Sequence, residues 1–347
     1  MKMNPLGHTG LKVSQLCLGS MTWGSQNTEA EGHSQIDRAL ERGVNFIDTA
    51  EMYPVTPKTA RTQGRSEEMI GTWLARTGRR EDVILASKIS GPGMDYIRGG
   101  AAITAETIPE AIEGSLRRMQ TDHIDLYQLH WPNRGSYMFR QNWQYDPSGQ
   151  DTAKVLDNIA ATLEALAAEI ARGTIRHVGL SNESAWGTAQ FLRLAEAQGG
   201  PRIASIQNEY SLLCRLYDTD LAEMTAHEQV GLLAYSPLAA GLLSGKYQGG
   251  AVPGGSRMSI IGDLGGRATD RAFAAVQAYL DIAARHGLDP SQMALAWTLT
   301  RPFLTSTIFG ATTLEQLDVA LGAAEVTLSR EVMDEIDATH RAHPMPY

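Results

Sequence analysis

The chain has 347 residues, of which 43% are hydrophobic and 20% charged, and its formal net charge is −9. This composition is typical of a folded protein with a large core, and the negative charge argues against nucleic acid or an anionic membrane as the partner. No run of about eighteen uncharged apolar residues occurs, so we expect no membrane span. Two cysteines, Cys17 and Cys214, are too few for a disulfide framework or a structural zinc site, which favours a cytoplasmic location.

The chain begins with a predicted hairpin over residues 2–14, in which Pro5, Gly7 and Gly10 supply turn residues. After it, short apolar runs typical of strands alternate with segments of helical periodicity. The expected strands are 15–19, 45–48, 83–87, 124–130, 177–181, 205–208, 231–235 and 306–309. The expected helices are 29–42, 66–76, 107–119 with Thr107 as cap, 155–171, 185–197, 217–228, 290–300 and 313–324, with extra helices at 270–286 and 329–340.

Eight strands alternating with eight helices, with no linker between halves, predict one α/β domain over residues 1–347. The expected fold is a (β/α)8 TIM barrel with an N-terminal β-hairpin and two extra helices. A doubly wound sheet is the alternative, but no G-x-G-x-x-G motif follows a strand; the nearest, Gly91-Pro92-Gly93, lacks its third glycine. Long connections at 89–106, 131–154 and 236–269 follow strands, where a barrel builds its active site.

Polar side chains stand at the ends of three consecutive expected strands. Asp48 ends N-F-I-D, Lys88 ends V-I-L-A-S-K and His130 ends D-L-Y-Q-L-H, while Tyr53 lies on the loop after Asp48. A buried carboxylate requires a positive partner, and a tyrosine that donates a proton near neutral pH requires a cation to lower its pKa from about 10. Each residue alone could be a rim or capping residue, but together they indicate acid–base chemistry. Glu51 is interpreted as an ordinary loop carboxylate.

These residues resemble the Asp-Tyr-Lys-His tetrad of the aldo-keto reductases, because N-F-I-D-T-A-x-x-Y (45–53) and the strand-ending lysine and histidine match it in order and spacing. The blocks G-L-S-N (179–182), Q-N-E-Y (207–210), Y-S-P-L-A-A-G-L-L-S-G-K (235–246) and F-G-A-T-T-L-E-Q (309–316) are similar to the branch of potassium-channel β subunits and bacterial Tas-like proteins. The resemblance extends from the hairpin through Ala324.

The resemblance implies an NADPH-dependent reduction of small aldehydes or ketones to alcohols. Tyr53 would be the general acid, Lys88 paired to Asp48 would lower the pKa of Tyr53, and His130 would orient the carbonyl. A cofactor-binding, redox-sensing module of low turnover, like a potassium-channel β subunit, is the alternative. The expected partner is a small carbonyl compound, the oligomeric state is left open with a homo-oligomer included, and no metal is expected.

The resemblance also assigns residues to NADP(H). Ser181, Asn182 and Gln207 would hydrogen-bond the carboxamide and Tyr235 would stack on the nicotinamide, although the first two could instead cap a helix and Tyr235 could be core. A glycine-rich flap over residues 241–257 would approach the pyrophosphate. The expected cofactor set is Met21, Gln26, Asp48, Ser181, Asn182, Gln207, Tyr235, Ser236, Leu238, Gly241, Ser244, Lys246, Arg257, Gly310, Thr312 and Gln316.

Phosphate selectivity is assigned to the flap, because Gly310 stands where many relatives have a lysine, and the flap carries the cations Lys246 and Arg257. Val319 and Ala320 stand where the branch has an acid and an amide for adenine. The loop 131–154 is rich in aromatic residues, which pack the loop or form the walls of an apolar carbonyl pocket. The residues assigned to that pocket are Trp23, Tyr96 and Trp131.

Overall fold

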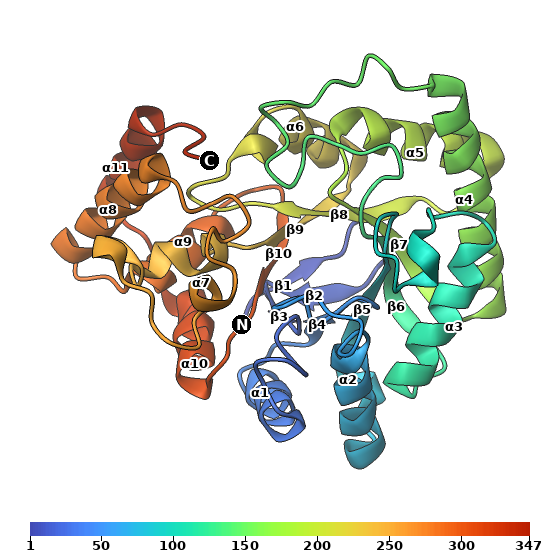
Figure 1. The fold of residues 1–347 in the computed structure, drawn as a ribbon, viewed down its shortest axis with the longest axis horizontal. Helices are drawn as coiled ribbons and strands as arrows, with labels where there is room; N and C mark the ends of the chain where they lie inside the picture. Colours follow the sequence, from blue (N-terminus) through green and yellow to red (C-terminus); the bar gives the residue numbers. More distant parts are fainter.

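A computed structural model describes all of residues 1–347. Eight parallel strands form a closed barrel in the order β10-β3-β4-β5-β6-β7-β8-β9, with helices around its outside (Figure 1). The strands are β3 (Leu16–Gly19), β4 (Phe46–Asp48), β5 (Ile84–Ile89), β6 (Ile124–Leu129), β7 (Ile175–Ser181), β8 (Ile203–Glu209), β9 (Gly231–Tyr235) and β10 (Leu304–Phe309). The predicted barrel is confirmed, and the doubly wound alternative is wrong.

The predicted N-terminal hairpin is also present. Strands β1 (Met3–Pro5) and β2 (Lys12–Ser14) pair antiparallel, and Val13 of β2 and Leu6, which follows β1, are completely buried. These two side chains pack with Cys17, Phe46 and other strand residues in a small apolar cluster. Ile47, between Phe46 and Asp48, belongs instead to the large cluster under the helices, as alternation along a strand requires. The hairpin therefore covers the end of the barrel where its strands begin.

Helices cover the barrel strands from outside, and most bury one apolar side, whereas α9 (Pro290–Leu299) is buried on all sides over Met293–Thr298. Those of the repeat are α1 (Glu29–Glu41), α2 (Arg65–Thr77), α3 (Thr107–Met119), α4 (Thr152–Arg172), α5 (Ala185–Gln198), α6 (Asp220–Glu228), α9 (Pro290–Leu299) and α10 (Leu314–Gly322). The two expected extra helices are α8 (Asp270–Arg285) and α11 (Arg330–Ala342), which pack together at one side of the barrel (Figure 1). None of the helices is both long and apolar enough to cross a membrane.

Local sequence explains where several helices begin, with one correction. Thr28 and Glu31 form a capping box at the start of α1, and Asp289 caps α9 just before Pro290. Thr107 is not the cap of α3, because it is already inside the helix and Glu106 precedes it without a side-chain cap. The Thr107 hydroxyl donates instead to the carbonyl of Ala102, which holds the preceding turn.

The long connection after β9 contains structure that the sequence did not indicate. A 3-10 segment, η4 (Ala239–Ser244), starts the flap, and a short helix, α7 (Arg257–Ile260), ends it. Gly241 has φ of 95°, a backbone conformation that residues with a Cβ rarely adopt, so the tight turn favours glycine. The flap is thus a folded element attached to the C-terminal end of β9.

Candidate active site

An ion pair joins the ends of β4 and β5. Nζ of Lys88 lies 2.6 Å from Oδ2 of Asp48 and donates to the carbonyl of Thr49 at 2.7 Å. The exposed fractions of the two side chains are 0% for Lys88 and 3% for Asp48. Burial favours the neutral amine, but the Asp48 carboxylate and the neighbouring Tyr53 outweigh it and raise the pKa of Lys88. The amine therefore stays positively charged at neutral pH.

Tyr53 lies beside this lysine on the loop after β4. Its hydroxyl is 3.5 Å from Nζ of Lys88, and Nζ lies 4.8 Å from the centre of the ring. Burial raises the pKa of Tyr53, and the positive charges of Lys88 and Arg257 oppose that shift without cancelling it. Lys88 acts in the expected direction and lowers the pKa of Tyr53, but burial of the phenol outweighs it, so the net pKa is raised and not lowered. The phenol is protonated at neutral pH.

His130 follows β6 on the other side of Tyr53. The two rings meet edge to face with centroids 5.8 Å apart, and His130 is 8% exposed. Burial, assisted by the charges of Lys88 and Lys58, lowers the pKa of His130 well below 6.5. Its Nδ1 atom is buried without a hydrogen-bond partner. A neutral imidazole can donate one N–H, so this ring can hold a carbonyl oxygen near the tyrosine hydroxyl.

The second oxygen of Asp48 accepts hydrogen bonds from two glutamines. Nε2 of Gln207 lies 2.8 Å and Nε2 of Gln128 lies 3.3 Å from Oδ1 of Asp48. Sequence reasoning assigned Gln207 to the cofactor and missed Gln128. Gln128 stands two residues before His130 on β6, and alternation along a strand puts both on the same side. That spacing is the signal that could have identified it.

The residues assigned to the nicotinamide lie together at the ends of β7, β8 and β9. The hydroxyl of Ser181 donates to the carbonyl of Gln207 at 2.8 Å, and Nδ2 of Asn182 donates to the carbonyl of His130 at 2.9 Å. The hydroxyl of Tyr235 donates to Oδ1 of Asn182 at 2.7 Å. The alternative that Ser181 and Asn182 cap the next helix is wrong, because Ser184 caps α5.

The flap reaches across the barrel rim to the loop after β3. Nε2 of Gln26 donates to the carbonyl of Gly255 at 3.0 Å, and the Arg257 guanidinium lies 3.2 Å from Sδ of Met21 and 3.4 Å from Oγ1 of Thr56. Arg257 has no carboxylate partner. Burial, together with the charge of Arg267, lowers the pKa of Arg257 to about 10. A shielded cation without a counter-ion is costly, which makes this a place for an anion.

The other residues assigned to the cofactor continue along the rim of the barrel mouth. The Ser244 hydroxyl donates to the carbonyl of Gly241 at 2.8 Å, in the η4 turn that Ser236 and Leu238 begin. The Lys246 ammonium lies 5.2 Å from the centre of the Tyr247 ring.

The residues assigned to the cofactor after β10 lie at the exposed end of that strand and on the loop that follows it. Gly310 is exposed, with only the carbonyl of Gly19 near the position of its absent Cβ. The Thr312 hydroxyl donates to Oε1 of Gln316 at 3.1 Å. Nδ2 of Asn27 donates to the carbonyl of Thr312 at 2.9 Å, which joins this loop to the one after β3. The assigned set thus forms one arc around half of the barrel mouth.

Of the three residues assigned to the substrate pocket, one is wrong. Trp23 is completely buried in the main core, where its Nε1 donates to Oε1 of Gln35 on α1. Trp131 does lie at the mouth, with its ring centroid 5.0 Å from that of His130. Tyr96 is 38% exposed, on the loop after β5. Phe139, from the loop after β6, meets Trp131 edge to face at 6.3 Å.

The interpretation of Glu51 as an ordinary loop carboxylate is also wrong. Glu51 is 2% exposed, forms an ion pair with Arg98 in which NH2 lies 2.7 Å from Oε1, and accepts from the amide of Ser90. Since Glu51 stands two residues before Tyr53, this pair fixes the loop that carries the phenol to the loop after β5.

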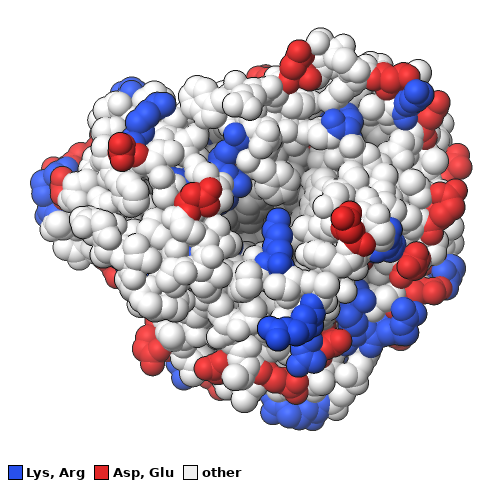
Figure 2. Space-filling view, in the orientation of Figure 1, with Lys and Arg blue, Asp and Glu red and all other residues white.

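A second carboxylate that the sequence reasoning missed connects the remaining loops. Glu209, at the end of β8, accepts from Arg267 at 2.7 and 2.8 Å and from Arg140 at 2.9 Å. The Tyr347 hydroxyl lies 3.2 Å from Oε1 of the same carboxylate. Glu209 follows Gln207 by two residues in Q-N-E-Y, so it shares the side of the strand that faces the site. The space-filling view shows a hollow on this face with Lys and Arg side chains along its rim (Figure 2).

Comparison with known proteins agrees with this arrangement. Residues 15–341 match the model of the aldo/keto reductase family. The chain is 45% identical to the protein tas of Escherichia coli (strain K12), in an alignment that covers 100% of this chain and 99% of that protein. It is 33% identical to the uncharacterized oxidoreductase YrpG of Bacillus subtilis, with 96% and 94% covered. It is 30% identical to a probable voltage-gated potassium channel subunit beta of Arabidopsis thaliana, with 99% and 98% covered.

These matches confirm the resemblance on which the sequence analysis rested. They extend over the barrel, the strand-end residues and the flap together. The chain belongs to the aldo/keto reductase family of oxidoreductases.

Proposed function

We propose that this protein reduces small aldehydes or ketones to alcohols with NADPH, with Tyr53 as the proton donor. The observation that carries the proposal is the contact at the barrel mouth between a protonated phenol and a charged lysine, with the Tyr53 hydroxyl 3.5 Å from Nζ of Lys88. A carbonyl oxygen held by the His130 N–H would lie close to that hydroxyl, because the two rings are 5.8 Å apart. When bound, NADPH supplies the hydride for the carbonyl carbon.

The roles of the chain's own groups follow from their charges. Tyr53 gives its proton to the carbonyl oxygen and is left as a phenolate. The Lys88 ammonium beside it stabilises that phenolate, and Asp48 keeps the ammonium charged and in place through their 2.6 Å contact. A neutral His130 donates a hydrogen bond without competing as an acid, since its pKa lies well below 6.5. Each of these roles requires the water-poor environment that burial supplies.

The arc from β7 to β10 supports a dinucleotide with an extra phosphate. Ser181, Asn182 and Gln207 offer amide and hydroxyl groups for a carboxamide, and Tyr235 offers a ring beside them. Arg257, which lacks a counter-ion, fits the 2′-phosphate or the pyrophosphate of NADP(H). The buried acid of the arc, Glu209, is occupied by two arginines and is not free to bind a ribose hydroxyl. We therefore propose NADPH over NADH.

Turnover with a carbonyl panel tests the proposal. Purified protein is assayed with NADPH or NADH and small aliphatic and aromatic aldehydes and ketones, by the loss of cofactor absorbance. We expect oxidation of NADPH with at least one of these compounds and a higher kcat/KM for NADPH than for NADH. No turnover, together with NADPH that stays bound through purification, would instead support the redox-sensing alternative.

A further inference from the structure

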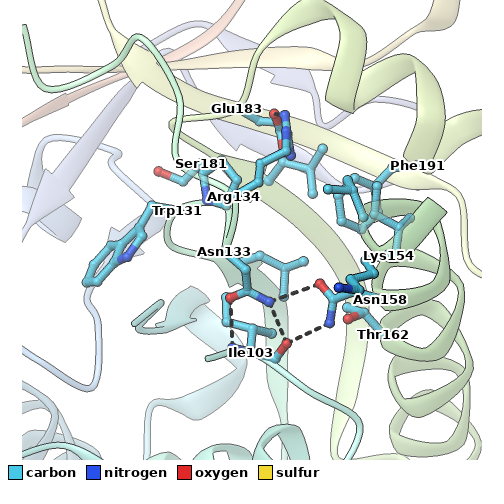
Figure 3. A pocket seen from close by; sticks show the side chains of 15 residues that line it. Ile103, Trp131, Asn133, Arg134, Lys154, Asn158, Thr162, Ser181, Glu183 and Phe191 are labelled. Atoms are coloured by element: carbon cyan, nitrogen blue, oxygen red, sulfur yellow. Dashed lines mark hydrogen bonds and ion pairs between the residues drawn. The ribbon is translucent and has the colours of Figure 1, made fainter. Parts of the chain in front are cut away.

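A cavity of about 220 Å³ lies beside the catalytic mouth, between the loop after β6, the first turns of α4 and the end of β7 (Figure 3). Tyr53, Lys88 and His130 do not line it, but Trp131 and Ser181 do, so it adjoins the proposed carbonyl and nicotinamide sites without including the proton donor. Its walls are largely apolar. The hydrophobic side chains that line it include Ile103, Leu129, Val155, Ile159, Leu180 and Phe191.

The two asparagines that line this cavity are hydrogen-bonded to each other and to the carbonyl of Ile103. Nδ2 of Asn133 donates to the carbonyl of Ile103 at 2.8 Å and to Oδ1 of Asn158 at 2.9 Å, and Nδ2 of Asn158 donates to the same carbonyl at 3.0 Å (Figure 3). The hydroxyl of Thr162, a lining residue that is 2% exposed, makes no hydrogen bond. The interior therefore offers mainly apolar contact, with a free hydroxyl beside it.

The charged side chains that line the cavity bear on which ligand charge it prefers. Arg134 and Glu183, which both line it, neutralise each other through a two-bond ion pair in which NH1 lies 3.0 Å from Oε2. Lys154 is the remaining charged lining residue, and its side chain is 84% exposed. Asp151, 3.4 Å from Nζ, is its only partner and is itself 53% exposed. The lining itself therefore carries one net positive charge, at Lys154, which Asp151 outside the lining partly offsets.

We propose that this cavity binds a small apolar carboxylate, with its ring or branched chain against Ile159 and Phe191 and its carboxylate at Lys154. The size agrees, because a cavity of about 150 Å³ holds benzene and this one is larger by the volume that a carboxylate needs. The apolar part of the ligand supplies most of the affinity, and the exposed Lys154 makes a negatively charged ligand bind better than a positively charged one. Binding at this cavity does not require the proposed reductase activity.

The cavity also shares a wall with the proposed catalytic site. Trp131 lines the cavity, and its ring lies 5.0 Å from that of His130 and 6.3 Å from Phe139. A ligand in the cavity restricts the motion of that indole and so changes the shape of the carbonyl pocket. On the proposed function, the occupied cavity changes the KM for aldehydes that reach Trp131.

Three ligands of similar size and different charge test the preference for an anion: benzoate, benzyl alcohol and benzylamine. Each is titrated into Tyr53→Phe protein, and binding is followed by calorimetry and by tryptophan fluorescence. We expect benzoate to bind more tightly than benzyl alcohol and benzylamine to bind weakest. Lys154→Glu, an exposed change that leaves the core intact, should weaken benzoate by roughly two- to fivefold and strengthen benzylamine by a similar factor.

Two phenylalanine substitutions on the same helix test the place of binding. Val155→Phe fills the cavity and should weaken benzoate at least about tenfold, since the ring loses its apolar contacts. Ala153→Phe, on the exposed side of α4, is the matched control and should leave the dissociation constant within about twofold. Benzoate that does not bind the parent protein, or that binds Val155→Phe and Lys154→Glu as tightly as the parent, would overturn the proposal.

The effect on turnover separates this proposal from the proposed function. In protein with Tyr53 intact, benzoate should change the KM of a bulky aldehyde, and Val155→Phe should abolish that change while Ala153→Phe retains it. If the protein reduces no carbonyl compound but benzoate binds as described, the cavity assignment stands and the proposed function fails. If the protein is a reductase but benzoate acts only as a competitor that Val155→Phe does not affect, the cavity assignment fails.

Discussion

The ammonium of Lys88 lies 2.6 Å from the carboxylate of Asp48, and neither side chain is more than 3% exposed. Two charges shielded to this degree depend on each other, because removing one leaves the other without its counter-ion in a low-dielectric environment. The same pair fixes the charge that faces the Tyr53 hydroxyl. On the proposed function, stability and proton transfer would therefore be coupled at this point of the barrel.

Lys88→Met should destabilise the protein and slow reduction. Asp48 would keep its glutamine donors but lose its counter-ion, and breaking a buried pair in this way costs about 3–5 kcal/mol of unfolding free energy. Urea unfolding measures the loss. The double variant Asp48→Asn/Lys88→Met, which removes both charges, should recover most of the stability and none of the activity. A single variant as stable as wild type would show that the pair contributes nothing to the fold.

Tyr53→Phe should reduce kcat by about 10²–10⁴-fold, the usual contribution of general acid catalysis, and leave the NADPH dissociation constant nearly unchanged. Reduction requires the protonated phenol, and burial raises the pKa of Tyr53 above 10.0. The wild-type rate of reduction should therefore hold through neutral pH and decline only above about pH 10. Steady-state kinetics and fluorescence titration measure these quantities, with Tyr96→Phe as the control. Wild-type turnover in Tyr53→Phe would exclude this residue as the acid.

Arg257→Ala should weaken NADPH binding by roughly ten- to hundredfold and NADH binding little, because a charge-assisted contact to phosphate contributes about 1.5–3 kcal/mol. The difference should shrink at high salt. Since burial disfavours the charge on this side chain, which has no carboxylate partner, the cofactor-free variant should be no less stable than wild type. Calorimetric titration and thermal unfolding measure both effects, with Arg341→Ala on α11 as the control. Equal losses for the two cofactors would exclude Arg257 as the phosphate contact.

His130 should make the protein less stable in mild acid. Its folded pKa is well below 6.5, so between that value and about 6.5 the unfolded chain binds a proton that the folded chain does not. Stability contributed by the neutral ring is present above about pH 6.5 and is lost as the pH falls. Urea unfolding at pH 5 and pH 7.5 should show a smaller difference for His130→Asn than for wild type. The exposed His227→Asn should behave as wild type, and identical pH dependence of all three would contradict the assignment.

Much of the barrel and the strand-end tetrad could be predicted because both depend on local sequence. Phe46 and Asp48 alternate with Ile47, so a short strand with a carboxylate at its end follows from three residues. The wrong assignment of Trp23 has the opposite cause. An aromatic residue after a strand looks the same whether it faces the mouth or the core, and here the acceptor that holds it, Gln35, lies on the next helix.

The ion pairs between loops could not be predicted from the sequence for a related reason. Glu51 and Arg98 are 47 residues apart in irregular segments, where no periodicity indicates direction. The pKa of Tyr53 likewise depends on how deep the ring lies relative to Lys88, a balance of burial against charge that spacing does not report. The sequence predicted well which functional residues end the barrel strands. It did not predict how close residues of different loops lie to one another.

The N-terminal hairpin has a consequence for synthesis of the chain. Nδ2 of Asn4 donates to the carbonyl of Thr305, 301 residues away, and the hydroxyl of Ser306 donates to the carbonyl of Ser14. The first and last barrel strands thus meet only when β10 has left the ribosome. Until then the growing chain exposes the unpaired edges of β3 and β9, and such long-range closure is slow and prone to aggregation. The yield of this protein in cells should accordingly depend on chaperones that hold a nearly complete chain.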